Sequence, residues 1–167
     1  MSHITNTVLM IRPVQFRMNE QTAVNNFYQK NSDTLPETVN AKATQEFDSM
    51  VEKLRNANIQ VIVVQDTKEF DTPDSIFPNN WISFHKNGTI GLYPMFAKNR
   101  RLERKDSILE AVEAEGFVIE TVVDYTEAET DGFYLEGTGS ILLDRENHKA
   151  YCALSARADE ELFIEFC

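Results

Sequence analysis

An internal repeat in the order of its predicted elements constrains the fold of this chain most. Hydrophobic periodicity predicts a helix over about residues 38–56, followed by a β-branched strand over 59–64. A loop with two prolines comes next, and then two strand-like runs that form a hairpin over 81–93. The same order of helix, strand, loop and hairpin returns over residues 102–154. The pattern predicts an α/β fold in which one structural unit recurs.

The spacing of the two copies supports the repeat. Ile59 and Phe117 open the equivalent strands and are 58 residues apart, and Trp81 and Gly139 open the equivalent hairpins at the same distance. Equal offsets for two different elements favour a true structural repeat, although identity between the copies is slight. The alternative is coincidence in an ordinary α+β domain. A third copy begins at a final helix from Ala158.

The remaining elements are shorter. A buried strand is predicted over 7–11 and a short helix over 19–30, and the second copy of the unit has its helix over 102–115 and its strand over 117–123. Between the first two strand-like runs, Asn87-Gly88 predicts a tight turn in which both residues have positive φ. The second hairpin turns around residues 145–148.

Composition excludes several classes of function. The 167 residues suffice for one domain, and a net charge of −11 disfavours general nucleic-acid binding. The segment 110–144 holds ten Asp or Glu and no Lys or Arg.

No apolar run is long enough for a membrane helix, and the N-terminus lacks the pattern of a signal peptide, so we expect a cytoplasmic protein. The two cysteines form neither a zinc motif nor a disulfide framework, and no metal or cofactor is expected.

The loops before the two hairpins are the candidate site. They hold the sequences DSIFPNNW, over 74–81, and LEGTGS, over 135–140. If the repeats are related by rotation, with their helices outside, both loops face one axis, and their carboxamide and carboxylate groups form a small polar pocket. The alternatives are that Asn79-Asn80 is a turn after Pro78 and that Glu136 is one more surface acid.

These residues lead to a family. The chain resembles the guanidino-group-modifying superfamily of arginine deiminases, dimethylarginine dimethylaminohydrolases and amidinotransferases, most closely a branch with citrulline-utilisation hydrolases. The stretches that carry the resemblance are VLMIRPVQFRMNEQTAVNNF, DSIFPNNWISFHKNGTIGLYPMFAKNRRLER, LEGTGSILLD and LSAR. The resemblance implies the pentein fold, an α/β-propeller of five ββαβ modules around a central site. It also implies hydrolysis of a C–N bond in arginine- or citrulline-type substrates.

The resemblance places five substrate-binding residues. An acid that grips the guanidinium in the family corresponds to Asn80, or to Asn79 if the gap is placed differently. Glu136 fills the first position of a second acidic turn. Arg100 and Arg157 stand where the family has arginines that bind the substrate α-carboxylate. The chain departs from the family at the end of the acidic turn, where a glycine or serine replaces an acid.

The change from acid to Asn80 has a chemical meaning. A guanidinium is a permanent cation that only donates hydrogen bonds, so a buried carboxylate suits it. The ureido group of citrulline is neutral and has a carbonyl that accepts. A carboxamide matches such a group without leaving a buried charge unpaired. Asn80 beside one remaining acid, Glu136, therefore favours a neutral or singly compensated substrate. The alternative is weaker guanidinium binding or a cap on the hairpin.

The catalytic residues of the family lie elsewhere. Its covalent mechanism uses a Cys nucleophile and a His acid and base, and both come from modules beyond residue 167. No pair among the candidates forms a credible Cys–His site: His3, His85, His148, Cys152 and Cys167. We therefore expect no catalytic residue here, and read residues 1–167 as the N-terminal portion of one pentein domain, a partial ring of two to three modules. The missing C-terminal half or a second copy is the expected partner. The alternative is a non-catalytic binding or assembly module on the same scaffold.

Overall fold

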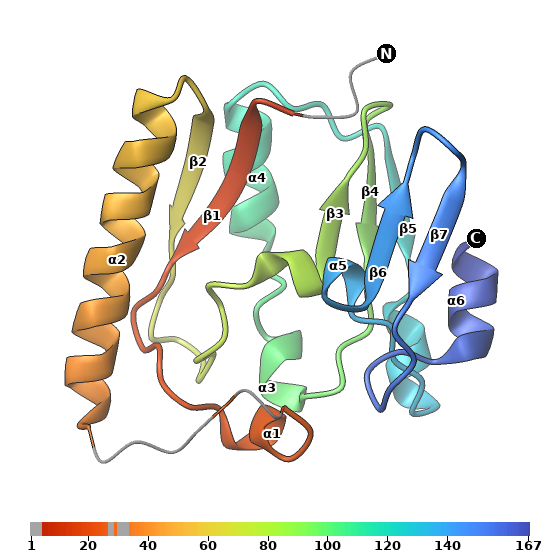
Figure 1. The fold of residues 1–167 in the computed structure, drawn as a ribbon, viewed down its shortest axis with the longest axis horizontal. Helices are drawn as coiled ribbons and strands as arrows, with labels where there is room; N and C mark the ends of the chain where they lie inside the picture. The colour runs from red at the N-terminus through yellow and green to blue at the C-terminus, as the bar shows by residue number, and fades with distance from the viewer. Residues whose placement is uncertain (1–4, 27–28, 30–33) are drawn as a thin grey trace.

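The computed structural model describes residues 5–26, 29 and 34–167 and has a mixed α/β fold (Figure 1). The elements follow one another in the order β1 (Thr7–Arg12), α1 (Glu20–Ala23), α2 (Pro36–Asn56), β2 (Gln60–Gln65), η1 (Pro78–Asn80), β3 (Ile82–Phe84), β4 (Thr89–Leu92), α3 (Lys98–Arg101), α4 (Asp106–Ala114), β5 (Thr121–Asp124), η2 (Thr126–Thr130), α5 (Gly137–Ser140), β6 (Ile141–Asp144), β7 (Lys149–Cys152) and α6 (Glu160–Phe166). No helix among the described residues has the length and apolar character needed to cross a membrane.

The strand pairings repeat as the sequence predicts. β1 and β2 pair in parallel, with α2 as the crossover between them. β3 and β4 form an antiparallel hairpin, and β5 returns through α4 to pair in parallel with β4. β6 and β7 form the next hairpin, which α6 follows. The two hairpins start at Ile82 and Ile141, 59 residues apart, close to the predicted offset.

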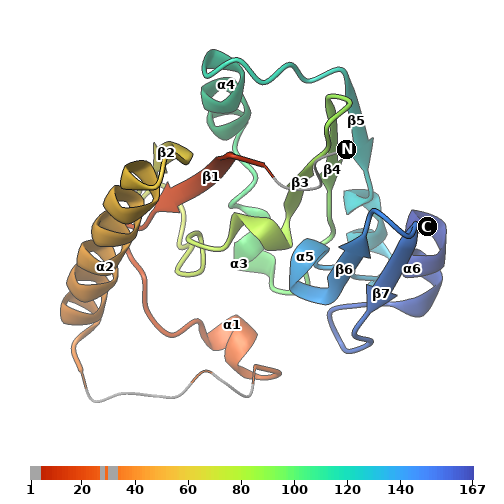
Figure 2. The ribbon, with the colours of Figure 1, turned by 45° about the horizontal axis from the view of Figure 1, so that its top comes forward.

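Each unit packs its own helix on one face of its strands. Because side chains alternate along a strand, β1 directs Val8 and Met10 toward Phe47 and Val51 of α2. In Figure 2, α2, α4 and α6 lie on the outer side of an arc of strands. This is the outer position that the sequence predicts for the helices.

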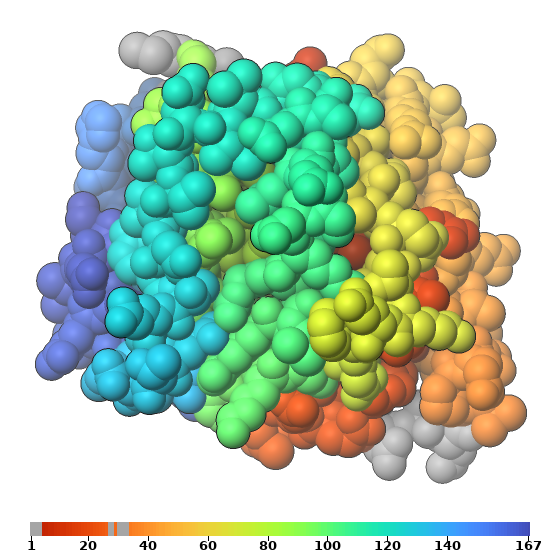
Figure 3. All heavy atoms as spheres, turned by 180° about the vertical axis from the view of Figure 1, so that it is seen from behind, coloured from red at the N-terminus to blue at the C-terminus, as the bar shows by residue number. Residues whose placement is uncertain are grey.

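The opposite face of the first strand pair is covered by the next unit. Leu9 and Ile11 of β1 pack against Trp81 and Ile82, in the core cluster that also holds Ile108 of α4. This cross-packing fixes the loop before β3 against the first unit. Seen from behind, the segment after β2 also lies against the segment that holds α3 and α4 (Figure 3), where Lys105 Nζ is 2.8 Å from Asp66 Oδ1.

The last hairpin shows the same pattern with one face uncovered. Ile141 of β6 is buried against Leu162 of α6. Leu142 and Tyr151 are register partners and point to the other face, where 65% and 52% of their surfaces are exposed. In the first unit, the strand face opposite the helix is covered by the unit that follows. No described residue covers the corresponding face of β6 and β7 in this way.

The turn of the first hairpin corrects one prediction. Gly88 has φ of 77°, but Asn87 does not share the left-handed conformation, so the expectation that both need positive φ is wrong. The Gly88 N–H donates to the carbonyl of His85, and Asn87 Oδ1 accepts from the Thr89 N–H. The turn therefore needs only one left-handed residue. A Cβ at Gly88 would lie 2.8 Å from the carbonyl oxygen of Val118.

Several predicted boundaries also differ. The helix predicted over 102–115 is shorter, because α4 begins only at Asp106 and ends at Ala114. The turn Lys98–Arg101, which precedes the predicted range, forms the separate helix α3. The strand predicted over 117–123 begins at Thr121 and ends at Asp124, although Phe117 still packs edge-on against Phe84 with ring centroids 5.3 Å apart. The helix predicted over 19–30 is the single turn of α1, and residues 27, 28 and 30 lie outside the described chain.

Arg100, which is buried and hydrogen-bonded to Glu103, fixes α3 to the loop that precedes η1. Arg100 is 3% exposed, and its Nε and Nη2 each donate to Glu103 at 2.9 Å. Nη2 also donates to the carbonyl oxygen of Phe77 at 2.9 Å. Burial raises the pKa of Glu103 to about 7, although the neighbouring Arg100 lowers it.

Glu103 should make stability fall with pH in the neutral range. Its carboxyl holds a proton up to about pH 7 when folded but releases it near the ordinary value of 4.5 when unfolded. The folded state therefore binds more protons than the unfolded state between these pH values. The contribution of this proton to the free energy of unfolding is complete below pH 4.5 and is lost above pH 7. We expect the difference in unfolding free energy between the native protein and Glu103→Gln to decrease from pH 5 to 7, and then to level off. Denaturant titrations across this range measure it, with Glu113→Gln as an exposed control; a difference that rises with pH would contradict the assignment.

Candidate functional site

The two candidate loops meet, as the repeat predicts. α5 lies beside the turn η1 in both ribbon views (Figures 1 and 2). Thr138 Oγ1 donates to the carbonyl oxygen of Asn79 at 3.2 Å, while the rest of Asn79 is exposed. Gly137 has φ of 28°, and a Cβ there would lie 2.6 Å from the same carbonyl oxygen. The backbones of the loops are thus in close contact, which only small residues in α5 permit.

Glu136 lies at the centre of this contact. Its side chain is 1% exposed, and its Oε2 accepts a hydrogen bond from Asn80 Nδ2 at 3.2 Å. Its Oε1 accepts from the backbone N–H of Phe96 at 3.3 Å. Burial raises the pKa of Glu136, and the nearby charges of Arg100 and Arg157 oppose that rise. The alternative reading of Glu136 as a surface acid is wrong.

The bond to Glu136 fixes the orientation of the Asn80 amide. An ionised carboxylate only accepts hydrogen bonds, so the amide must direct its Nδ2 toward Glu136. A Cβ at residue 139 would collide with this same Nδ2, and Gly139 therefore leaves the space that the amide occupies. The amide oxygen Oδ1 is then the group of Asn80 that remains to accept hydrogen bonds from another molecule.

The two predicted arginines have different surroundings. Arg100 is held by Glu103 and by backbone carbonyls, and its charge acts on Glu136 through space. Arg157 lies across from Glu136, with its Nη1 3.7 Å from Glu136 Oε2. Its Nε and Nη2 donate to Asn25 Oδ1 at 2.8 and 2.6 Å, and Nη2 also donates to the carbonyl oxygen of Thr22.

A buried polar network was missed by the sequence analysis. Asn19 Nδ2 donates to Asp74 Oδ2 at 2.8 Å, and Thr22 Oγ1 donates to the same oxygen at 3.1 Å. Asn99 Nδ2 donates to Asn19 Oδ1 at 2.9 Å, and all four side chains are buried. The available signal was Asn19 before Glu20, which is typical of a helix N-cap, and Asn19 does cap α1. The network joins the N-terminal segment to both the 74–80 loop and α3.

The alternative catalytic residues have other contacts. His85 Nε2 lies 2.9 Å from Ser83 Oγ and its Nδ1 lies 3.1 Å from Arg145 Nη1, while burial lowers its pKa. Burial raises the pKa of the half-buried Cys152 thiol, which disfavours the thiolate. His3 lies outside the described residues. The described part of the chain has no cluster of three or more His, Cys, Asp or Glu that could hold a metal ion.

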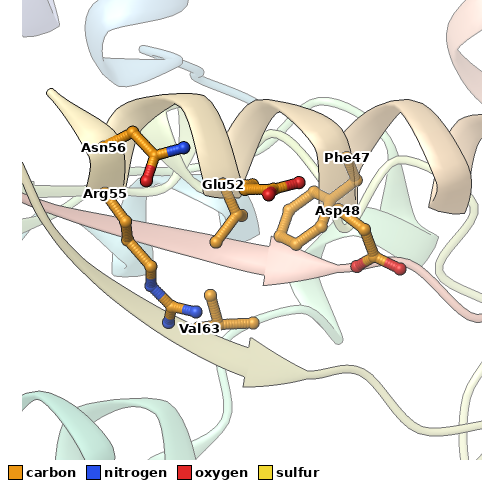
Figure 4. Close-up of a pocket in the computed structure, with 7 residues that line it drawn as sticks. Phe47, Asp48, Glu52, Arg55, Asn56 and Val63 are labelled. Carbon is orange, nitrogen blue, oxygen red and sulfur yellow. The ribbon is translucent and has the colours of Figure 1, made fainter.

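A separate groove runs between α2 and β2 (Figure 4). It has a volume of about 400 Å³, and Phe47 and Val63 give it an apolar floor. Asp48 at its rim forms a bidentate ion pair with Arg12, at 2.7 Å for both contacts. Arg55 donates to the carbonyl oxygen of Val61. These charged groups are engaged within the fold, and none of the predicted site residues lines the groove.

Gly139→Ala should destabilise the protein through Asn80. The new methyl group collides with Asn80 Nδ2, so the amide must leave Glu136 and a buried hydrogen bond is lost. We expect a loss of about 1–3 kcal/mol in unfolding free energy. In an Asn80→Ala background the collision is absent, and the same change should cost much less. Chemical denaturation of the four proteins of this double-mutant cycle measures the coupling; additive effects would mean that Asn80 does not occupy this position.

Comparison with known proteins agrees with this geometry. The family model for eukaryotic N,N dimethylarginine dimethylhydrolase matches residues 12–167. A search of curated proteins finds no match. Among solved structures, the N-terminal domain of ArgZ, a cyanobacterial arginine dihydrolase bound to its substrate, is similar with a TM-score of 0.66 and 17% identity. AgrE in complex with L-arginine is similar with a TM-score of 0.67 and 20% identity.

These matches cover nearly all of this chain but a much smaller share of the proteins that it resembles. The alignment takes in 96% of this chain in both cases, but only 53% of the ArgZ domain and 21% of AgrE. The chain thus spans about half of the ArgZ domain that it resembles. At these identities the likeness shows a shared mixed α/β fold. The family match, which extends over nearly the whole sequence, shows more: the chain belongs to the N,N dimethylarginine dimethylhydrolase family, within the guanidino-group-modifying superfamily, and corresponds to its N-terminal part.

Proposed function

We propose that this chain is the N-terminal part of a guanidino-group hydrolase that binds an arginine- or citrulline-type amino acid and cleaves a C–N bond at its terminal group. The observation that carries the proposal is the hydrogen bond from Asn80 to the buried Glu136, which joins the loops of two structural repeats. A buried acid beside an oriented amide is suited to a planar group with several N–H donors. Guanidinium and ureido groups are both of this kind.

In this proposal Asn80 and Glu136 bind the terminal group of the substrate. Asn80 Oδ1 accepts from an N–H of that group, since Nδ2 is engaged by Glu136. Glu136 already faces the charges of Arg157 and Arg100, so its own negative charge is largely balanced before a ligand arrives. A neutral ureido group therefore enters without an uncompensated charge, which supports a citrulline-type substrate.

At the other end of the substrate we assign the α-carboxylate to Arg157, through Nη1. Arg100 contributes charge, and it holds the 74–77 loop through the carbonyl oxygens of Asp74 and Phe77. Asn79 supports the site through its backbone contact with Thr138. The guanidinium of an arginine is planar and presents paired N–H donors, so it suits a carboxylate better than the ammonium group of a lysine at the same place would.

The reaction itself would use groups from outside this chain. In the proposed mechanism a Cys thiolate attacks the central carbon of the terminal group, and the C–N bond breaks as a His donates a proton to the leaving nitrogen. Water, deprotonated by the same His, then attacks this carbon and releases the thiolate. We further propose that the ββαβ unit formed by β3, β4, α4 and β5, together with the partial units before and after it, is part of a larger ring of two to three such units here and others beyond. The exposed Leu142 and Tyr151 support this, because the equivalent face of the first unit is covered by the unit that follows it.

The 167-residue chain should bind substrate without turnover. It is expected to bind L-arginine or L-citrulline but to release neither ammonia nor an amine, because removal of a covalent catalytic group costs many orders of magnitude in rate. Isothermal titration with each amino acid and an ammonia-release assay at the same protein concentration test this. Activity that disappears in Cys152→Ser would show that the nucleophile lies within this chain.

Asn80→Asp should shift the binding preference toward arginine. The substitution places a second carboxylate beside Glu136, and two close carboxylates repel each other unless a cation lies between them. L-arginine supplies that cation and L-citrulline does not. We expect the ratio of the two affinities to move toward arginine by at least about threefold, or roughly 0.7 kcal/mol.

The same titrations on Asn56→Asp control for the added charge, because Asn56 is exposed at the end of α2. A ratio that changes equally in both variants, or in neither, would mean that Asn80 does not contact the terminal group.

A further inference from the structure

We propose that Asn25 is a positioning residue for Arg157, and that it holds this arginine away from Glu136 so that one arm of the guanidinium stays available to a ligand carboxylate. The inference rests on the proposed function in one respect, namely that Arg157 binds the carboxylate. The contact itself joins residues 132 positions apart in the chain.

The hydrogen bonds of Arg157 leave one nitrogen for a ligand. A guanidinium carries five N–H groups: one on Nε and two on each Nη. Asn25 Oδ1 accepts from Nε at 2.8 Å and from Nη2 at 2.6 Å. The carbonyl oxygen of Thr22 accepts from Nη2 at 2.9 Å. Among the described residues no acceptor lies within hydrogen-bond distance of Nη1, and Nη1 is the nitrogen that faces Glu136.

The distance to Glu136 indicates restraint. Nη1 lies 3.7 Å from Glu136 Oε2, which is longer than a hydrogen-bonded ion pair of about 2.7–2.9 Å. Glu136 is buried, so a closer bidentate pair with Arg157 would be favourable in this low-dielectric setting. Asn25 and Thr22 hold the other two nitrogens of the guanidinium and so oppose that collapse.

The two acceptors that hold Arg157, Asn25 Oδ1 and the carbonyl oxygen of Thr22, form a clamp that is anchored in the buried polar network. Thr22 is 1% exposed, and its hydroxyl donates to Asp74 Oδ2. The N–H of Asn25 donates to the carbonyl oxygen of Thr22 at 3.2 Å, so the two acceptors of the clamp belong to one closed turn. Asn25 itself is exposed, and its replacement should therefore change the position of Arg157 without unfolding the chain.

Removal of the clamp should let Arg157 pair directly with Glu136. The carboxylate-binding arm is then neutralised, and the affinity for a free amino acid falls. Agmatine, which is arginine without its carboxylate, does not use this arm. The proposal therefore predicts that Asn25→Ala weakens binding of L-arginine about tenfold and changes binding of agmatine by less than about twofold.

The experiment uses the 167-residue chain in three variants. Asn25→Ala removes the acceptor, Asn25→Asp keeps an oxygen acceptor in the same place, and Asn56→Ala on α2 is the control. Titration calorimetry with L-arginine and agmatine measures affinity. The ¹⁵N NMR signal of the Arg157 Nε–H, assigned by its loss in Arg157→Lys, reports directly on the contact with Asn25.

We expect Asn25→Ala to shift this signal and speed its exchange with water, and Asn25→Asp to preserve it and retain most of the arginine affinity. An unchanged Nε–H signal in Asn25→Ala would overturn the positioning role, whatever the ligands do. A shifted signal with equal losses for both ligands, or with tighter arginine binding, would also overturn it. If the native chain binds neither ligand, the proposed function fails, while the Nε–H signal still decides whether Asn25 holds Arg157.

Discussion

The buried carboxylate of Glu136 is the interaction on which this part of the molecule depends. A carboxylate with 1% exposure is costly unless it is hydrogen-bonded and its charge is balanced. Asn80 and the backbone of Phe96 supply the hydrogen bonds, and Arg157 supplies a facing charge. These partners come from three separate segments, so a single buried acid requires all of them to be in place.

The repeated framework brings these segments together. Each unit packs its helix on one face of its strands, and the following unit covers the other face of the first pair. This arrangement carries the loop before each hairpin to the same side of the arc, which places Asn80 against the turn of Glu136. Glycine at residues 137 and 139 allows the loops to approach until backbone and side chain touch. Arg100, which Glu103 orients, then holds the 74–77 loop through hydrogen bonds to the carbonyl oxygens of Asp74 and Phe77.

Features that depend on local pattern were predictable from the sequence, whereas features that depend on distant contacts were not. The convergence of Asn80 and Glu136 was predictable because equal offsets imply equivalent positions. The links from Asn19 to Asp74 and from Asn25 to Arg157 join residues 55 and 132 positions apart, and no periodicity reports on them. The short helix α3, which precedes the helix expected from residue 102, was not predictable for a related reason. Its formation goes with the direction of Arg100 into a buried contact with the 74–77 loop.

The most direct test of a ligand site around Glu136 is an NMR titration of the ¹⁵N-labelled chain with L-citrulline. The largest shift changes should fall on the Asn80 side-chain amide and the Phe96 backbone N–H, which both donate to Glu136, and on Thr138 and Arg157 beside it. Signals of α2 and β2 around the groove in Figure 4 should stay unchanged. Shift changes confined to that groove, or no saturable change at any of the four residues at millimolar citrulline, would contradict a substrate site at Glu136.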